Sequence, residues 1–560
     1  MSIDPEFSGP ARRQVHVADT EYRAVAEGRI RIRIGAAIFA FALMVAVIRL
    51  AEVSLLSSGK NTNNYSQSAK LERADIVDRN GELLATTLTT YTLYARSEYV
   101  WNAAETARAL HELFPDMEAQ DFQRRLTRPG DQLLIRRGLT PKEKQNVFLL
   151  GQPGLMFEAE PQRVYPRGHL ASHIVGFTDV DLKGLAGSER AFDTALSEPN
   201  APSLALSVDL RVQNAAAEEL QKSLEHFKAD TGAAIVMDMN NGEILAMASL
   251  PNYDPNHPNT TSPQNLYNHA SMSTYELGSV FKPITMAMAL EYGVTDLVET
   301  FPVQKPLKVR DKYIRDDHPS QHPIAMPTIL ADSSNRGTAM IAQRVGGDRQ
   351  QMFLKELGLM DRVPIELTES AAPQVQREWQ DITTVTVSYG HGISVTPLAL
   401  TTAIATLLNG GEYVAPTLRK RDTVHTAQKR RVITAETSQK LRDLMRYVAT
   451  DGTGKKADVD GYAIMGKTGT ADKPSINGYD ERRLVSSFIA AFPYQDPQYV
   501  VFVTFDEPKA VEGTHGYATA GWNAAPTAGK IIERIAPILG VERDTGPVLE
   551  SPFSETPAVR

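Results

Sequence analysis

Three short motifs whose side chains could carry out acyl transfer occur in order along the chain. They are Ser279-Val280-Phe281-Lys282, Ser333-Ser334-Asn335 and Lys467-Thr468-Gly469. A serine hydroxyl is a poor nucleophile until a neighbouring base takes its proton. A lysine amine can act as that base when burial and a second cation lower its pKa. The ordered triplet therefore predicts an enzyme that works through an acylated serine.

The spacing within the first motif assigns roles to its two reactive side chains. If Ser279 lies at the start of a helix, Lys282 lies one turn later on the same face. We therefore expect Ser279 to be the nucleophile and Lys282 to be its base. Lys467 could be the second cation, Ser333 could relay a proton between the two lysines, and Asn335 could hold a substrate amide.

The third motif also predicts a surface for the substrate. Thr468, Gly469 and Thr470 have the pattern of an edge strand, against which an extended peptide could lie. Gly469 has no side chain and leaves room for a close backbone approach. The backbone N–H groups of Ser279 and Thr470 are the expected oxyanion hole. Taken singly, Ser279 could be a helix N-cap and Lys467 a solvated strand lysine, so only the complete set favours catalysis.

Two further segments fit one motif each but lie in the wrong context. Ser57-Ser58-Gly59-Lys60 fits the first pattern within a linker at 57–67 that is rich in Ser, Asn and Gly. Ser475-Ile476-Asn477 fits the second pattern, but it follows the third motif in a loop with proline and glycine. We expect neither segment to take part in catalysis.

A group of acidic and histidine side chains just before the second motif raises the alternative of a metal site. Its members are Asp316, Asp317, His318 and His322. The H-x3-H spacing ligates a metal well on a continuous helical turn, which Pro319 disfavours. We therefore expect a loop here, and no metal or cofactor for an acyl transfer that uses an oxyanion hole.

Composition limits the classes of function. The chain has 560 residues, of which 42% are apolar, 59 are Lys or Arg, 67 are Asp or Glu and none is Cys. That length suggests about two to four domains with an ordinary apolar core. A formal charge of -8 argues against general nucleic-acid binding, which needs a basic surface. The lack of cysteine excludes disulfides, thiolate catalysis and cysteine-ligated zinc.

An apolar run with a basic N-terminal flank predicts a membrane anchor. The run extends over 23 residues from Ile34 to Leu56, and its only charged residues are Arg49 and Glu52. This length is enough to cross about 30 Å of hydrocarbon. The arginines before the run place residues 1–33 in the cytoplasm. We predict an uncleaved signal anchor, with a cleaved signal peptide and a buried core helix as the alternatives.

Two folded modules are expected after the anchor. Residues 57–200 mix short β-rich runs with amphipathic helices and should form a non-catalytic pedestal or dimerisation-like module. Pro199 and Pro202 mark the boundary with a catalytic domain at 201–540, whose strands come first and last with helices between them. Residues 541–560 are rich in Pro, Glu and Ser or Thr and are expected to be disordered. The elements predicted individually are the strand 89–95, the helix 103–113, the hairpin strands 233–239 and 244–248, the helical stretch 286–290, the strands 483–491 and 499–504, and the helix 524–538.

Beyond the triplet, the chain resembles a known family from about Leu71 to Leu539. The segments that carry the resemblance are Arg73 to Gly81, Arg163-Val164-Tyr165-Pro166, Gly168, His173 to Thr178, Gly184 to Glu189, Tyr275 to Gly278, Pro283, Ser388-Tyr389-Gly390, Thr396-Pro397, Asn409-Gly410-Gly411 and Gly466 to Thr470. The family is the class B penicillin-binding proteins, which are membrane-anchored peptidoglycan D,D-transpeptidases. The resemblance implies an α+β chain with a single N-terminal transmembrane helix and an extended mixed α/β pedestal. It also implies a transpeptidase domain of the β-lactamase-like kind, with an antiparallel sheet flanked by helices.

One segment is similar to the branch of the family that serves cell division. It is Gly176-Phe177-Thr178, with Asp181, Gly184, Gly187 and Glu189 behind it. The chain also has no room for a glycosyltransferase module before Arg73, which argues against the bifunctional class. Two positions depart from the family pattern: Leu277, where proline is common, and Arg336, where a small apolar residue is usual.

The resemblance implies a two-step reaction. Ser279 would attack the carbonyl between the two terminal D-alanines of a stem peptide, and an amine from a neighbouring stem would then attack the acyl-enzyme. β-lactams would imitate the D-alanyl-D-alanine end and acylate Ser279. The expected catalytic residues are Ser279, Lys282, Ser333, Asn335 and Lys467, and the expected substrate-binding residues are Thr468, Gly469 and Thr470. The alternatives are an elongation-type transpeptidase, a D,D-carboxypeptidase or β-lactamase-like hydrolase, and a division scaffold with a dispensable site.

Partners and location follow from the same resemblance. A polytopic glycan polymerase of the SEDS type would pack against the anchor helix, alongside other division proteins. The chain would cross the cell inner (cytoplasmic) membrane once, with its catalytic domain outside the cytoplasm.

The anchor prediction is tested by sequencing the N-terminus of the protein extracted from membranes. Because the apolar run is long enough to span and lacks a clear cleavage site, we expect the mature chain to retain residues 34–56. A mature chain that begins after Leu56 would show that the segment is a cleaved signal peptide.

Overall fold

The computed structural model describes Ile34 and residues 37–45, 73–421, 427–475, 478–546 and 551–554, with only the backbone of Glu481. The chain divides into two compact units, Met1–Leu71 and Glu72–Arg560. Within the described part of the chain, no helix is long and apolar enough to cross a membrane. The predicted cytoplasmic segment 1–33, most of the predicted anchor and the linker at 57–67 lie outside the described residues.

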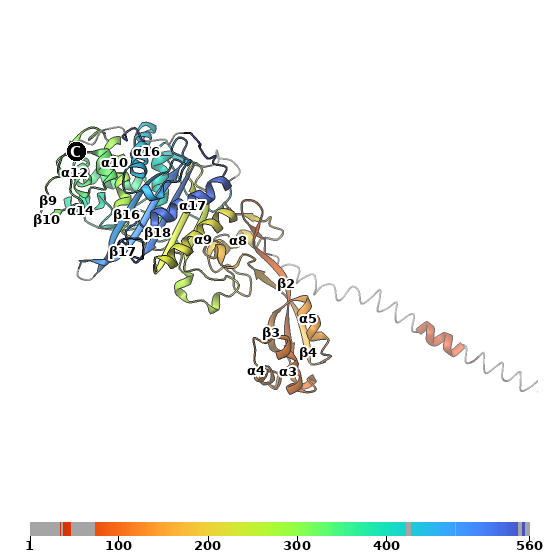
Figure 1. Cartoon of the computed structure of the whole chain (residues 1–560). Coiled ribbons are helices and arrows are strands. Elements are labelled where there is room, and N and C mark those ends of the chain that lie inside the picture. Colours follow the sequence, from red (N-terminus) through yellow and green to blue (C-terminus); the bar gives the residue numbers. More distant parts are fainter. Residues whose placement is uncertain are drawn as a thin grey trace, which may run out of the picture. The chain divides into compact units, whose positions relative to one another are not determined.

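A long strand organises the module that precedes the catalytic domain. This strand, β2, pairs with β4 along its length on one edge, and with β1 and β3 on the other. Helices α3, α4 and α5 close one end of the sheet over a small apolar core (Figure 1). The predicted strand 89–95 and helix 103–113 are both confirmed. The elements are β1 (Ile76–Val77), β2 (Leu83–Ala95), α3 (Ala103–Leu113), α4 (Ala119–Leu126), β3 (Leu133–Leu139), α5 (Pro141–Phe148), β4 (Leu155–Val164), α6 (Ser172–Val175), α7 (Gly187–Ala191), α8 (Asp193–Leu196) and β5 (Leu204–Ala205).

A buried carboxylate joins three of the segments that carry the family resemblance. Arg73 Nε donates to Glu189 Oε2 at 2.5 Å, and Arg163 Nε donates to Glu189 Oε1 at 2.7 Å. Arg73 also donates to Asp193 at 2.8 Å. Arg73, Arg163 and Glu189 are all buried, so the charge of Arg163 is compensated by Glu189, and that of Arg73 by Glu189 together with Asp193.

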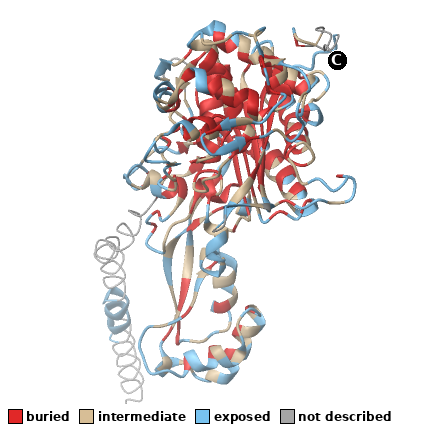
Figure 2. Cartoon of the chain, turned by 90° about the vertical axis from the view of Figure 1, so that its left-hand side faces the viewer, coloured by how far each residue is buried: buried red, intermediate tan, exposed pale blue. Residues whose placement is uncertain are grey.

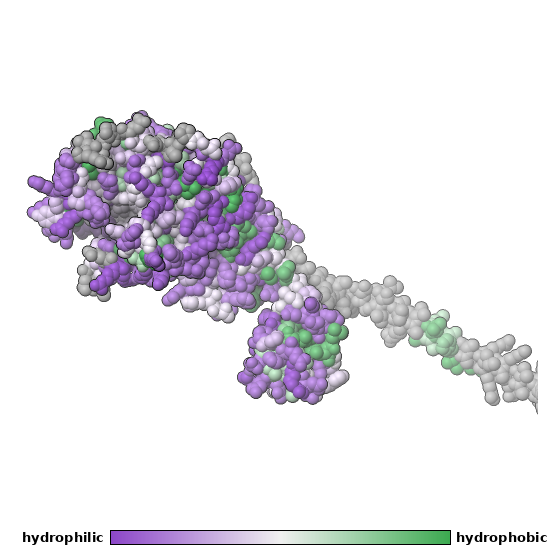
Figure 3. Space-filling model, in the orientation of Figure 1, coloured by the Kyte–Doolittle hydropathy of each residue, from purple (hydrophilic) through white to green (hydrophobic). Residues whose placement is uncertain are grey.

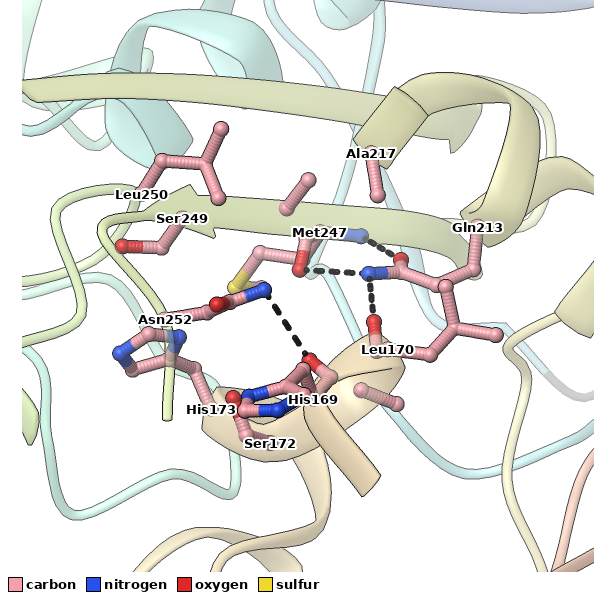
Figure 4. Close-up of a pocket in the computed structure, with 12 residues that line it drawn as sticks. His169, Leu170, Ser172, His173, Gln213, Ala217, Met247, Ser249, Leu250 and Asn252 are labelled. Carbon is pink, nitrogen blue, oxygen red and sulfur yellow. Dashed lines mark hydrogen bonds between the residues drawn. The ribbon is translucent and has the colours of Figure 1, made fainter. Parts of the chain in front are cut away.

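One glutamine fastens this module to the catalytic sheet. Gln213 Nε2 donates to the carbonyl of Leu170 at 2.9 Å and to that of Met247 at 3.3 Å, while its Oε1 accepts from Met247 N at 2.8 Å. Figure 4 shows the amide between these two backbone segments. Since the buried amide is fully hydrogen-bonded, it fixes the junction without an unsatisfied polar group.

The catalytic domain is built on an antiparallel sheet of five strands. Their order is β16 (Met465–Ser475), β17 (Gly478–Phe492), β18 (Tyr499–Asp506), β6 (Thr231–Asp238) and β7 (Ile244–Leu250). The sheet thus combines two strands from the start of the domain with three from its end, and β6 and β18 form the pair that joins the two groups. This confirms the predicted hairpin, the later strands and the α+β class.

Both faces of the sheet are covered by helices, so its central strands are buried on two sides. Along β6, Ile235 and Met237 belong to one apolar cluster, while Ala234 and Val236 belong to another. Helices α9 (Leu210–His226) and α17 (Ala524–Ile538) pack on the second cluster, and α15 (Pro397–Leu408) and α16 (Ala435–Thr450) pack on the first. Figure 2 shows this buried interior, which is much larger than that of the pedestal. The remaining helices are α10 (Lys282–Glu291), α11 (Met326–Ala331), α12 (Asn335–Val345), α13 (Gly347–Glu356) and α14 (Asp381–Ser388).

Part of the C-terminal tail differs from its predicted disorder. Ser551 is buried and donates its hydroxyl to the carbonyl of Asp443 in α16 at 3.0 Å. The ring of Phe553 lies 6.0 Å from that of Tyr447. The average composition of the tail does not reveal such a contact, because a single aromatic side chain of a polar segment can pack against the folded domain.

The Glu189 cluster gives a stability prediction. We expect Glu189→Gln to destabilise the protein by about 3–5 kcal/mol, because it leaves the buried Arg163 guanidinium without its counter-ion and leaves buried Arg73 with Asp193 alone. The shift in the denaturation midpoint of the full chain measures this effect. Glu82→Gln is the control, since Glu82 pairs with Arg167 at an exposed site and should cost about 0–1 kcal/mol. Equal shifts for the two variants would contradict the role of Glu189.

Candidate active site

Ser279 lies in a short 3-10 turn that leads directly into a helix. The turn spans Gly278–Phe281 and continues as α10, and the backbone N–H of Lys282 donates to the carbonyl of Ser279. Gly278 has a φ of +60°, which favours glycine at the point where the chain enters the turn. Ser279 remains partly accessible, whereas Lys282 is fully buried. The predicted helix start is therefore correct, with a tighter first turn.

The hydroxyl of Ser333 lies between the amines of two buried lysines. Lys282 Nζ is 3.0 Å from Ser333 Oγ, and Lys467 Nζ is 3.1 Å from the same atom. Lys282 also donates to the Ser333 carbonyl, and Lys467 donates to the Thr468 carbonyl at 3.0 Å. One member of each motif is thus brought into direct contact, although the motifs are far apart in the sequence.

The environment of the two lysines lowers their affinity for protons. Burial holds the pKa of Lys282 well below its ordinary value, and the nearby cation of Lys467 lowers it further. Asp316 and Asp317 oppose this shift in the pKa. Burial also lowers the pKa of Lys467 to about 7. A neutral amine is therefore accessible near neutral pH, which a general base requires.

The second motif presents its polar groups through an unusual backbone conformation. Ser333 has a φ of +59°, in the left-handed region that non-glycine residues rarely adopt. It precedes α12, whose first residue is Asn335. The Asn335 side-chain amide donates to the carbonyl of Arg315 at 3.3 Å. The turn therefore directs Ser333 toward the lysines while Asn335 remains partly accessible.

The third motif lies on β16, which is an edge strand, as the sequence predicts. Gly469 is needed for a close approach, but the approaching group is part of the protein. A Cβ atom at Gly469 would lie 2.4 Å from the Leu277 carbonyl oxygen and 3.1 Å from the backbone N of Val280. The absent side chain therefore lets the Gly278–Phe281 turn pack against the strand.

Contacts that the sequence does not indicate hold the two threonines of this strand. The hydroxyls of Thr468 and Thr453 are 2.8 Å apart, and Thr470 Oγ1 accepts from the backbone N of Ala520 at 3.1 Å. Neither Thr453 nor Ala520 belongs to a recognisable motif, so only the fold identifies them.

Glu276, just before the Gly278–Phe281 turn, links this part of the chain to two other segments. Its Oε1 accepts from the backbone N of Gly392 at 2.8 Å, and its Oε2 accepts from the Tyr479 hydroxyl at 2.9 Å. The ring of His391 lies 5.5 Å from that of Tyr479. The segment around Gly390 was expected from the resemblance, whereas Tyr479 carries no signal in the sequence.

The acidic and histidine group before the second motif lies in an irregular segment, which matches the predicted loop. Asp316 to His322 fall between the short strands β10 (Lys312–Ile314) and β11 (Ile324–Ala325). Among the residues that the structure describes, no group of three or more His, Cys, Asp or Glu side chains could hold a metal ion.

Comparisons with known proteins agree with this geometry. Residues 232–533 match the penicillin binding protein transpeptidase domain, and residues 68–197 match the penicillin-binding protein dimerisation domain. The chain is 40% identical over 530 residues to a probable peptidoglycan D,D-transpeptidase FtsI of Caulobacter vibrioides, covering 92% of this chain and 90% of that protein. It is 33% identical over 524 residues to a probable peptidoglycan D,D-transpeptidase PenA of Neisseria gonorrhoeae, covering 87% and 88%.

A solved structure shares the fold. The crystal structure of penicillin binding protein 3 from Mycobacterium tuberculosis, complexed with aztreonam, superimposes with a TM-score of 0.67 at 24% identity, covering 86% of this chain and 99% of that one. Both family domains occur in order, and one relative is 40% identical along nearly the whole chain, so the family of this chain is established. The chain belongs to the class B penicillin-binding proteins, in the division branch that includes FtsI.

Proposed function

We propose that this chain is a peptidoglycan D,D-transpeptidase that cross-links stem peptides during septal wall synthesis, with Ser279 as its nucleophile. The observation that carries the proposal is the position of the Ser333 hydroxyl between Lys282 and Lys467, beside the Ser279 turn. The names of the relatives, which are peptidoglycan D,D-transpeptidases, support the substrate class.

In the first step, Ser279 Oγ attacks the carbonyl carbon between the two terminal D-alanines. Neutral Lys282 takes the hydroxyl proton, and the backbone N–H groups of Ser279 and Thr470 stabilise the oxyanion. The C–N bond then breaks, and the departing D-alanine amine receives a proton relayed through Ser333. An ester between Ser279 and the shortened stem remains.

In the second step, an amine of a neighbouring stem attacks that ester. The amine gives up a proton to the same base, an amide forms, and Ser279 Oγ leaves and regains its proton. In a β-lactam the leaving nitrogen stays tethered to the acyl group, so the ester persists. In both steps, Asn335 and the free edge of β16 hold the extended stem peptide.

We further propose that residues 34–56 anchor the chain in the cytoplasmic membrane, with the catalytic domain outside the cytoplasm. The basic flank and the apolar run support this placement. A SEDS-type polymerase and other division proteins are the proposed partners. The pedestal offers surface for them, since Trp101, Phe148 and Leu149 are exposed (78%, 65% and 72%). Figure 3 shows a group of hydrophobic residues on the surface of this module.

Labelling with a fluorescent penicillin tests the catalytic assignment. We expect Ser279→Ala to abolish labelling, because it removes the nucleophile. Lys282→Ala should slow acylation by about 10²–10⁴-fold, because it removes the positioned base. Near-normal acylation by a well-folded Lys282→Ala variant would remove Lys282 from that role.

Ser475→Ala is the matched control for this experiment. Ser475 fits the second motif pattern but lies at the exposed end of β16, so its loss should leave labelling intact. Ser57→Ala should also leave labelling intact, because Ser57 fits the first motif pattern only within the linker sequence at 57–67. A large loss in either variant would contradict the use of context to separate the motifs from their copies.

The dependence of acylation on pH tests the role of the lowered lysine pKa values. Acylation should fall as pH drops below the pKa of Lys282, because protonation removes the base. Lys467→Met removes a cation that lowers the pKa of Lys282, so this acid limb should move to higher pH. Lys440→Met, at an exposed site on α16, is the control. An acid limb that stays in place or moves to lower pH in Lys467→Met would contradict the coupling.

A further inference from the structure

The carboxylate of Asp316 meets the start of α12 with both of its oxygens. Oδ1 accepts from the backbone N of Asn335 at 2.6 Å and from that of Arg336 at 3.0 Å. Oδ2 accepts from the Ser334 hydroxyl at 2.8 Å. Three consecutive residues of the second motif region therefore converge on one side chain, which belongs to a different loop. Figure 1 shows β9 (Leu307–Val309) and β10, which precede that loop, next to α12.

A buried cation holds this carboxylate from its other side. Arg336 is buried, and its guanidinium donates to the Val303 carbonyl at 2.6 Å. Its Nε lies 3.9 Å from Asp316 Oδ2 and has no hydrogen-bond partner. Both side chains are almost inaccessible, at 5% for Arg336 and 4% for Asp316. The departure from the family pattern at Arg336 thus supplies the counter-ion of Asp316.

The contacts matter because the residue before them is strained. Ser333 is held in a left-handed conformation, which a non-glycine residue keeps only when its surroundings fix it. The turn on its N-terminal side contributes two backbone bonds, from Ser333 N to Leu330 O at 3.3 Å and from Ser334 N to Ile329 O at 2.9 Å. On the C-terminal side, the Asp316 carboxylate immobilises the next three residues.

The same loop also contacts the side chain expected to bind substrate. The Arg315 carbonyl accepts from the Asn335 amide, so adjacent residues of the loop hold both the backbone and the side chain of Asn335. A carboxylate at a helix N-terminus is also favoured by the free N–H groups and the helix dipole. Asp316 therefore couples the placement of Ser333 to that of Asn335.

From this geometry we propose that Asp316 is a positioning residue for acylation, which fixes Ser333 between the two lysines and aims Asn335 at the substrate. The proposal rests on the proposed acyl-transfer function. It assigns Asp316 no contact with the reacting atoms, and no metal.

The test measures acylation by a fluorescent penicillin over a range of concentrations, with the full chain. This separates the limiting acylation rate from the apparent affinity, and labelling to completion gives the active fraction. We expect Asp316→Ala to lower the limiting rate at least tenfold and to weaken the apparent affinity. Asp316→Asn should restore part of the rate, because its amide oxygen can still accept from the two backbone N–H groups. Asp311→Asn, at an exposed acid between β9 and β10, should stay within about twofold of the natural protein.

A purely structural role predicts a different pattern. It would lower the melting temperature and the active fraction while leaving the limiting rate of the folded fraction unchanged, and that result would overturn the proposal. Failure of both Asp316 variants to fold would overturn it too, since Asp316 would then be required for the fold itself. If the natural chain is not labelled through Ser279, the proposed function fails instead, whatever the Asp316 variants do.

Discussion

Burial of two lysine amines around one serine hydroxyl is the constraint on which the rest of the catalytic domain depends. A charged amine without partners is expensive to bury, so such groups are hydrogen-bonded or lose their proton. Here the Ser333 hydroxyl and the carbonyls of Ser333 and Thr468 accept from the two amines. The low pKa of Lys282 and the presence of Ser333 between the lysines are therefore two aspects of one arrangement.

The sheet and the helices place this arrangement at an accessible edge. Because β16 pairs only with β17 among the described strands, its other edge is free for an extended peptide. The Ser279 turn packs against this strand at Gly469, where only a glycine leaves enough space. The same strand thus carries Lys467 into the interior and leaves one backbone edge unpaired next to the Ser279 turn.

In the pedestal, too, buried polar groups are paired, here as carboxylates with guanidinium groups. The carboxylate of Glu189 pairs with two buried arginines that are 90 residues apart in the sequence. Gln213 then joins this module to the catalytic sheet through three hydrogen bonds. In both places a fully paired polar group fixes a geometry that apolar packing alone would leave less specific.

The sequence by itself determined the type of chemistry, the order of the motifs and most of the secondary structure. Local patterns suffice there, because two short apolar runs joined at Asn240-Asn241-Gly242 specify a hairpin such as β6–β7 within a few residues. Only the tertiary structure decided which side chains meet. Arg73 and Glu189 are 116 residues apart in the sequence. Asp316 and Asn335 are 19 residues apart, and no motif includes both of them. Distant segments also contribute the groups that fix the left-handed turn at Ser333 and bury Lys282. Local sequence patterns therefore cannot predict either feature.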